Sequence, residues 1–197
     1  IYRQGCGVSV LTKSDLILRD LELLKAINGQ ARTVVCTTLT TLDEDLCRVL
    51  EPNVCTTRRR FEMLRTMRES GIHTGVWLCP ILPFINDTEE NLRGLLGYCF
   101  DAGVEVIVNF GMSVTLRDGD RQYFYAQLDR HFPGMKERYI RAFGDRYECP
   151  SPNSVRLRQV FEEVCRTHGI ICRTDKAMEY LAAFQDRQAG EQLNLFA

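Results

Sequence analysis

The sequence lacks an excess of charge, a long apolar run and an export signal, and each absence excludes a class of protein. Its 25 basic and 26 acidic residues leave a formal net charge of −1, whereas strong non-specific nucleic-acid binders carry a clear basic excess. No stretch approaches the ~20 uninterrupted apolar residues of a membrane-spanning helix. No basic stretch followed by an apolar one marks a leader. With 45% hydrophobic residues among 197, we predict a globular, cytoplasmic protein without membrane contact.

Short cysteine spacings are also missing, although cysteines are plentiful. The closest pair, Cys165 and Cys172, is separated by seven positions, so no CxxC or other metal-ligand spacing occurs and we predict no metal site. Several thiols stand inside apolar runs, where cysteine behaves as a small core residue. This favours a reducing compartment over a disulfide framework. The nine cysteines are Cys6, Cys36, Cys47, Cys55, Cys79, Cys99, Cys149, Cys165 and Cys172.

The first residues predict that this chain is a piece of a longer protein. It starts at Ile1 rather than at a methionine. Residues 1–5 have the pattern of a helix end, because Gly5 suits the left-handed position that follows a C-cap.

Strand alternates with helix through the first half of the sequence. Each of the first three of four β-rich apolar runs is followed by one or two apolar-periodic segments with a capping residue at the start, and mainly helical sequence follows the fourth. Crossovers of helical length imply a parallel α/β sheet, either curled like a barrel or open and doubly wound. No GxGxxG or Walker A sequence supports a nucleotide-binding open sheet. The predicted strands are residues 8–12, 32–38, 73–79 and 104–110, and the predicted caps are Ser14, Thr41, Thr57 and Thr88.

After Gly111 the pattern becomes mainly helical, with breaks at residues 133–134 and 150–152. The apolar run 170–172 predicts one added strand. Aromatic residues between 123 and 143 indicate packing between helices. We therefore divide the chain into a sheet region, residues 1–112, and a mainly helical C-terminal region, residues 113–197, packed on it.

The candidate site residues follow from where strands end. In barrel-type α/β folds the active site lies at the carboxyl ends of the strands. Lys13 stands directly after the first strand, and its alternative role is that of a solvated loop lysine. Thr38 ends the second strand, where threonine also occurs for its β-propensity alone. The amide of Asn109 ends the fourth strand and needs a hydrogen-bond partner or a ligand.

Two other charged features have structural explanations. The run Arg58-Arg59-Arg60 suggests a phosphate patch, but helical spacing spreads these side chains over more than one face, so we predict a solvated outer surface. Glu105 stands at the start of the fourth strand, on the same face as Asn109; it either forms a salt bridge at the amino-terminal edge of the sheet or faces solvent, and we predict the salt bridge.

At the strand ends the sequence resembles a known family. Residues 11–20, LTKSDLILRD, resemble a motif of the radical S-adenosylmethionine proteins related to spore photoproduct lyase, often labelled DNA repair photolyases. The same order continues with TLTTLD (38–43), LEP (50–52), RFEML (60–64), ESGI (69–72) and PILPFIND (80–87). The resemblance rests on the order of these motifs over residues 8–110, because no single motif is specific to the family.

The resemblance implies the later part of a six-stranded partial (β/α) barrel, of which this chain holds about four βα units. In such lyase-like enzymes a CxxxCxxC loop after the first strand holds a four-iron four-sulfur cluster that acts on S-adenosylmethionine. This sequence lacks that loop. We therefore expect the cluster ligands in a missing N-terminal half of the same protein, and this chain alone to be inactive. Whether DNA is a substrate stays open, because the C-terminal region reads as helical.

Some cofactor contacts carry over by position. Lys13 matches a lysine near the aminoacyl part of S-adenosylmethionine, where a cation would pair with the carboxylate. Thr38 matches a position usually held by serine. Residues 80–83, with Pro80 and Ile81, match the loop that lines the adenine. Asn109 joins these candidates from its place at a strand end; no catalytic residue is implied.

Two other functions fit the residues alone. One is a Schiff-base lyase or aldolase with Lys13 as its nucleophile, which requires a closed eight-stranded barrel of ~250 residues. The other is a non-catalytic binding module. If the chain starts just before the third strand of the family barrel, the strand at 8–12 loses its neighbour on one side, so we expect an exposed edge, exposure of Leu11 and Val34, and self-association.

Overall fold

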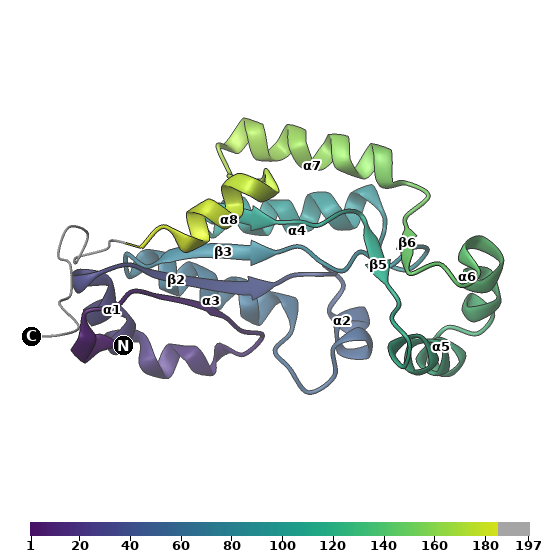
Figure 1. The fold of residues 1–197 in the computed structure, drawn as a ribbon, viewed down its shortest axis with the longest axis horizontal. Helices are drawn as coiled ribbons and strands as arrows, with labels where there is room; N and C mark the ends of the chain where they lie inside the picture. The colour runs from purple at the N-terminus through teal and green to yellow at the C-terminus, as the bar shows by residue number, and fades with distance from the viewer. Residues whose placement is uncertain (185–197) are drawn as a thin grey trace, which may run out of the picture.

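The computed structural model describes residues 1–184; the part of the C-terminal region from 185 to 197 lies outside the described residues. Four strands form one parallel sheet in the order β1-β2-β3-β4 (Figure 1). The α/β prediction with four strand–helix units is confirmed. The strands are β1 (Val8–Leu11), β2 (Thr33–Thr38), β3 (His73–Trp77) and β4 (Val106–Val108).

Helices after each of the first three strands return the chain to the amino-terminal edge of the sheet. The 3-10 helix η2 (Asp15–Asp20) leads into α1 (Leu21–Gln30), while α2 (Glu44–Leu50) and α3 (Thr57–Glu69) follow β2, and α4 (Glu89–Asp101) follows β3. Because consecutive strands are parallel, their carboxyl ends, and the loops that follow them, meet at one edge.

Side-chain caps set several of these helix starts. The Ser14 hydroxyl accepts a hydrogen bond from the Leu16 N–H at 3.2 Å, and the Thr88 hydroxyl accepts one from the Asn91 N–H at 3.1 Å, as predicted. The α2 cap is Asp43, which accepts from two backbone N–H groups, rather than Thr41.

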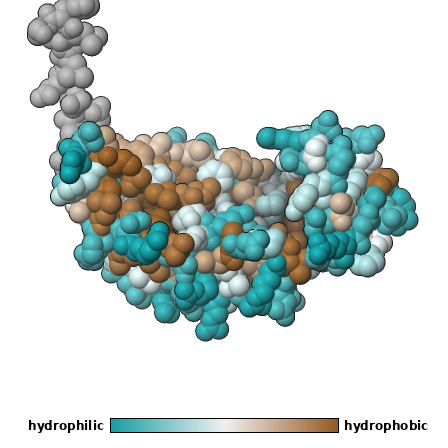
Figure 2. Space-filling view, turned by 90° about the horizontal axis from the view of Figure 1, so that it is seen from below, coloured by the Kyte–Doolittle hydropathy of each residue, from teal (hydrophilic) through white to brown (hydrophobic). Residues whose placement is uncertain are grey.

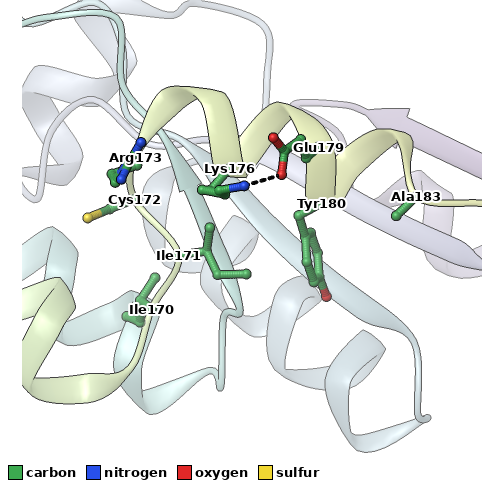
Figure 3. Close-up of a pocket in the computed structure, with 8 residues that line it drawn as sticks. All are labelled: Ile170, Ile171, Cys172, Arg173, Lys176, Glu179, Tyr180 and Ala183. Carbon is green, nitrogen blue, oxygen red and sulfur yellow. Dashed lines mark hydrogen bonds and ion pairs between the residues drawn. The ribbon is translucent and has the colours of Figure 1, made fainter.

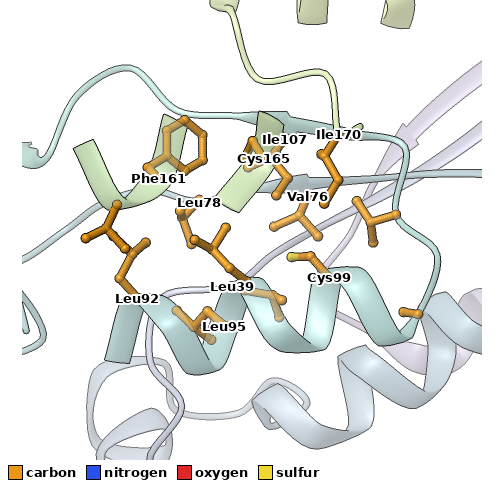
Figure 4. Close-up of a cluster of buried hydrophobic side chains, with 14 of the residues drawn as sticks. Leu39, Val76, Leu78, Leu92, Leu95, Cys99, Ile107, Phe161, Cys165 and Ile170 are labelled. Atoms are coloured by element: carbon orange, nitrogen blue, oxygen red, sulfur yellow. The ribbon is translucent and has the colours of Figure 1, made fainter. Parts of the chain in front are cut away.

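The outer face of the sheet packs against helices in the main core. Figure 4 shows Val76 of β3 and Ile107 of β4 beside Leu95 and Cys99 of α4. Helix α7 (Ser154–His168) covers the same cluster through Phe161 and neighbouring side chains. Strands buried in this way read as continuous apolar runs, which explains the sequence of β4.

The opposite, inner face of the sheet is covered by the C-terminal helix α8 (Thr174–Ala182). Val34 packs with Ala177 and Leu181 of this helix and is 0% exposed. The expectation that Val34 is exposed is therefore wrong, because a helix some 140 residues later in the chain lies over it. Leu11 is 50% exposed, as expected.

The rest of the C-terminal region contains a small sheet that the sequence did not predict. Strands β5 (Ser113–Thr115) and β6 (Glu148–Pro150) pair in antiparallel fashion, around α5 (Asp120–His131) and α6 (Met135–Phe143). The run 170–172 makes a single parallel bridge, between Ile171 and Val106, rather than a full strand.

Other local predictions hold. The 3-10 helix η1 (Tyr2–Gln4) ends at Gly5, whose φ of 66° is left-handed. Glu105 forms the predicted ion pair at the amino-terminal edge, with Arg68 at 3.1 Å. Its other oxygen contacts His73 at 3.0 Å and accepts a hydrogen bond from the Tyr180 hydroxyl at 2.9 Å. Within residues 1–184, none of the helices is long and apolar enough to cross a bilayer.

The position of α8 leads to a stability prediction. Leu181→Ala removes a buried contact with the inner face of the sheet, so we expect a loss of ~2–4 kcal/mol in the free energy of unfolding, measured by urea titration. Met178→Ala, on the exposed side of the same helix, is the control and should change it by less than about 0.5 kcal/mol. Equal effects of the two substitutions would show that α8 does not cover this face in solution.

Candidate functional site

The carboxyl ends of β1 and β2 are joined by a cluster of charged side chains. Lys13, one residue beyond Thr12 at the end of β1, forms an ion pair with Glu51, the Nζ and Oε1 atoms lying 2.6 Å apart. The other carboxylate oxygen of Glu51, Oε2, lies 2.7 Å from Nη1 of Arg60. We call Lys13, Glu51 and Arg60 the charged triad.

Glu51 occupies the centre of the triad at the C-cap of α2. Besides the two cations, its Oε2 accepts a hydrogen bond from the Thr40 hydroxyl at 3.3 Å. Burial opposes ionisation of this carboxyl, but the contacts with Lys13 and Arg60 outweigh it, and the pKa of Glu51 lies below its usual range. Glu51 is therefore a carboxylate at neutral pH.

The prediction of a solvated outer surface is wrong for Arg60. Its side chain is 0% exposed, and Nη1 also donates to the carbonyl of Thr38 at 3.0 Å. Arg58 and Arg59 are exposed as predicted. The signal was present in the helical spacing, because Arg60 falls on the buried stripe of α3 together with Thr57, Leu64 and Met67.

Lys13 is fixed at both its backbone and its charged end. Its carbonyl accepts a hydrogen bond from the Cys55 N–H at 3.2 Å, and Ser14 next to it caps η2. The side chain is 42% exposed, so the ammonium has both a protein partner and an open side. Burial raises the pKa of the nearby Cys79 thiol, while the charge of Lys13 opposes this shift.

The loop after β3 is held by side-chain hydrogen bonds, and its two candidate residues differ in exposure. Ile81 is 2% exposed and belongs to the main core, whereas Pro80 lies on the surface. The side chain of Asn86 accepts from the Leu82 N–H at 2.6 Å and donates to the Thr40 carbonyl at 2.9 Å. The loop is thereby attached to the segment that follows β2.

Asn109, at the end of β4, has both ends of its amide occupied within the chain. It donates to the Leu78 carbonyl at 2.6 Å and accepts from the Gly111 N–H at 3.0 Å. Its partner is therefore the neighbouring backbone, and it shapes this corner of the strand ends. Next to it, Phe110 is 59% exposed and its ring lies 5.6 Å from that of Trp77.

A groove of about 580 Å³ lies away from the charged triad, between α8 and residues 170–173 (Figure 3). Its charged groups include Lys176 and Glu179, which pair with each other at 2.7 Å. We place the candidate site at the strand ends instead, because a cation with an open side stands there.

The described residues do not form a metal centre. Between residues 1 and 184, no three His, Cys, Asp or Glu side chains are grouped to hold a metal ion. An iron–sulfur cluster therefore does not fit the residues described.

Comparisons with known proteins identify relatives of part of the chain. No family model matches it. Uncharacterized proteins of Mycobacterium bovis and Mycobacterium tuberculosis are each 33% identical over 135 residues, which are 68% of this chain and 39% of the relative. An uncharacterized protein of Methanocaldococcus jannaschii is 34% identical over 82 residues, 42% of this chain and 30% of that protein. The chain thus spans 39% or less of the length of these curated relatives.

Solved structures define the class of fold. Spore photoproduct lyase complexed with dinucleoside spore photoproduct matches with a TM-score of 0.58 at 14% identity, over 83% of this chain and 49% of that one. A mutant of that lyase with bound AdoMet and dinucleoside spore photoproduct gives a TM-score of 0.57 at 11% identity over the same shares. At these identities the likeness shows the fold alone. The chain has a radical S-adenosylmethionine-like fold.

The charged triad leads to a prediction on pH. Because the pKa of Glu51 is lowered in the folded state from an ordinary value of 4.5, its ionic contribution to stability is present above that pH and is lost as the pH falls through the folded-state pKa. We expect Glu51→Gln to lower the free energy of unfolding at pH 7, and the difference from wild type to shrink towards pH 3, as measured by urea titration at each pH.

Glu22→Gln on the exposed surface of α1 is the control, with an expected change below about 0.5 kcal/mol at either pH. A Glu51→Gln effect of the same size at pH 7 and pH 3 would contradict the lowered pKa.

Proposed function

We propose that this chain is the cofactor-contacting and substrate-facing later part of a radical S-adenosylmethionine enzyme with lyase-like chemistry. The observation that carries the proposal is the charged triad at the carboxyl edge of a radical S-adenosylmethionine-like sheet. S-adenosylmethionine fits the residues present, since Lys13 offers an ammonium with an open side to its carboxylate.

The candidate residues have distinct tasks in this proposal. Lys13 pairs with the carboxylate, and the hydroxyl of Thr38 makes a neutral hydrogen bond. Pro80 offers apolar contact to the adenine, while the buried Ile81 supports the same loop from beneath. Asn109 holds the turn at the end of β4. In such enzymes the bound cofactor, with its iron–sulfur cluster, supplies radical chemistry; the ligands of that cluster are assigned to the missing N-terminal half, and no step is derived through it.

The Schiff-base alternative is less well supported. A lysine that forms a Schiff base must present a free amine to the carbonyl substrate. The Nζ atom of Lys13 instead lies in an ion pair with Glu51 at 2.6 Å. The binding-module alternative does not explain why a buried arginine and a glutamate are arranged behind this one lysine.

Substitution of Lys13 tests the proposal. In the intact protein, Lys13→Ala should weaken S-adenosylmethionine binding by ~1.5–3 kcal/mol, the range for a hydrogen bond to a charged group, as measured by titration calorimetry. Lys25→Ala on α1, a lysine of similar exposure that also pairs with a glutamate, is the control and should leave the affinity unchanged. Equal affinities of Lys13→Ala and wild type would show that Lys13 is only a loop lysine.

Thr38 allows a paired comparison, because serine keeps its hydroxyl without the methyl group and valine keeps its shape without the hydroxyl. Thr38→Ser keeps the hydroxyl and should retain the affinity for S-adenosylmethionine. Thr38→Val removes the hydroxyl and should cost ~0.5–1.5 kcal/mol of binding free energy, the range for a neutral hydrogen bond. The same calorimetric titration measures both affinities. An unchanged affinity of Thr38→Val would show that Thr38 does not contact S-adenosylmethionine through its hydroxyl.

We also propose that another part of the same protein covers the free edge of β1 in the intact molecule. In the described residues β1 has one strand neighbour, β2, and Leu11, Leu16 and Leu23 around it each expose half or more of their surface. Figure 2, seen from below, shows apolar surface gathered on this side of the molecule. An open strand edge beside apolar surface favours pairing with another chain.

The 197-residue chain by itself should therefore self-associate. We expect its sedimentation coefficient to rise with concentration, and Leu11→Lys to reduce that rise by placing a charge beside the edge. Val155→Lys on α7, also an exposed apolar position, is the control and should leave the association intact. A concentration-independent monomer would contradict the proposed role of this edge.

A further inference from the structure

The charged triad contains two residues that need not touch a ligand, and we infer that Glu51 and Arg60 are positioning residues that hold Lys13 as a fixed cation for a carboxylate-bearing ligand. The inference rests on the proposed function, because it takes the S-adenosylmethionine carboxylate as the group that Lys13 meets. The inference explains how Lys13 can bind an anion although it already forms an ion pair with Glu51.

The first step concerns the orientation of Lys13. A lysine side chain has a flexible stem of four carbons, so it loses considerable conformational entropy when it is held in one orientation. Here Glu51 fixes it, through the 2.6 Å contact between Oε1 and Nζ. Glu51 is held in turn by Arg60 at 2.7 Å and by the Thr40 hydroxyl at 3.3 Å. The ammonium is thus placed before a ligand arrives, which lowers the entropy cost of binding.

The second step concerns charge. A lysine paired with a glutamate is a neutral pair that attracts an anion only weakly. Arg60 adds a second cation behind the carboxylate, so the triad of two cations and one anion keeps one net positive charge. Since the Arg60 side chain is 0% exposed, solvent and salt screen its charge less than that of a surface arginine.

The third step concerns how Arg60 is bound. Nη1 contacts both Glu51 and the Thr38 carbonyl. One guanidinium group therefore orients Thr38 directly and Lys13 through Glu51, and both are proposed cofactor contacts. Its Nε and Nη2 atoms are buried and have no hydrogen-bond partner among the described residues. Arg60 is therefore held through Nη1, which contacts Glu51 at 2.7 Å and the Thr38 carbonyl at 3.0 Å. A buried ion pair is weak support for stability, because apolar side chains of similar volume often serve as well.

The test compares two ligands that differ in the group Lys13 is proposed to meet. S-adenosylmethionine carries the carboxylate, whereas decarboxylated S-adenosylmethionine keeps the sulfonium and the amine and lacks only the carboxylate. In the intact protein, Arg60→Met should weaken binding of S-adenosylmethionine by about tenfold, equivalent to ~1.4 kcal/mol, and change binding of decarboxylated S-adenosylmethionine by less than about twofold. Arg60→Lys keeps the charge and should restore most of the affinity. Both ligands are titrated by calorimetry.

A double variant separates charge from orientation. Arg60→Met combined with Glu51→Gln returns the site to one net positive charge, on Lys13 alone, but removes the ionic anchor of its side chain. We expect the affinity for S-adenosylmethionine to remain below that of wild type. Full recovery would show that charge alone matters and would overturn the positioning role.

The remaining outcomes are also decisive. An unchanged S-adenosylmethionine affinity in Lys13→Ala rejects the proposed function itself. If Lys13→Ala binds weakly while Arg60→Met binds like wild type, or if Arg60→Met loses both ligands equally, the proposed function stands and this inference is wrong. Should Arg60→Met not fold, Glu51→Asp is the deciding variant. It keeps the negative charge but moves the carboxylate away from Lys13 by one methylene, and it should weaken binding of only the carboxylate-bearing ligand. Equal binding of both ligands to Glu51→Asp and wild type would overturn the inference.

Discussion

The ion pair between Arg60 and Glu51 is the contact on which the arrangement of the strand ends depends. Two buried charges are costly to remove from water, and breaking such a pair by deleting one partner costs more than the pair itself contributes. Here the pair links α3 to the C-cap of α2, and through Lys13 and the Thr38 carbonyl it reaches the ends of β1 and β2. Four elements of the chain, β1, β2, α2 and α3, therefore share one electrostatic constraint.

The packing of the sheet explains why the chemistry is confined to that edge. The outer face is closed by α1, α3, α4 and α7, and α8 covers the inner face. The amino-terminal edge carries Glu105 with its partners Arg68, His73 and Tyr180, where burial and the Glu105 carboxylate raise the pKa of Tyr180 to about 12. Among the described residues this leaves the carboxyl edge, with Lys13, and the free side of β1 as the open parts of the sheet.

Much of this could be predicted from the sequence, because the deciding signals are local. Alternating apolar periods gave the four strands and their helices, and capping residues such as Ser14 and Thr88 gave helix starts. The predictions that failed depended on contacts between distant segments. Burial of Val34 depends on Leu181, and the pairing of β5 with β6 joins residues more than 30 positions apart.

Arg60 is an intermediate case between these two kinds of residue. Its place on the apolar stripe of α3 was visible in the spacing, but the arginines beside it suggested a solvated surface, and its partner Glu51 belongs to another helix. When the three consecutive arginines are interpreted together as an exposed surface, the buried position of Arg60 is missed. A test of each arginine against the helical period separates Arg60 from Arg58 and Arg59.

The fold and the charged triad bear on function in different ways. A radical S-adenosylmethionine-like sheet shared at 14% identity says where a site lies, since ligands gather at the carboxyl ends of parallel strands, but it does not say what is bound there. The triad adds information that the fold does not contain. It places a positive charge on Lys13 at this edge, and the buried side chains of Glu51 and Arg60 set the orientation of that charge. Affinity for an anion at the end of β1 is thus inferred from the side chains of this chain, and the fold adds only the place on the sheet where that anion would lie.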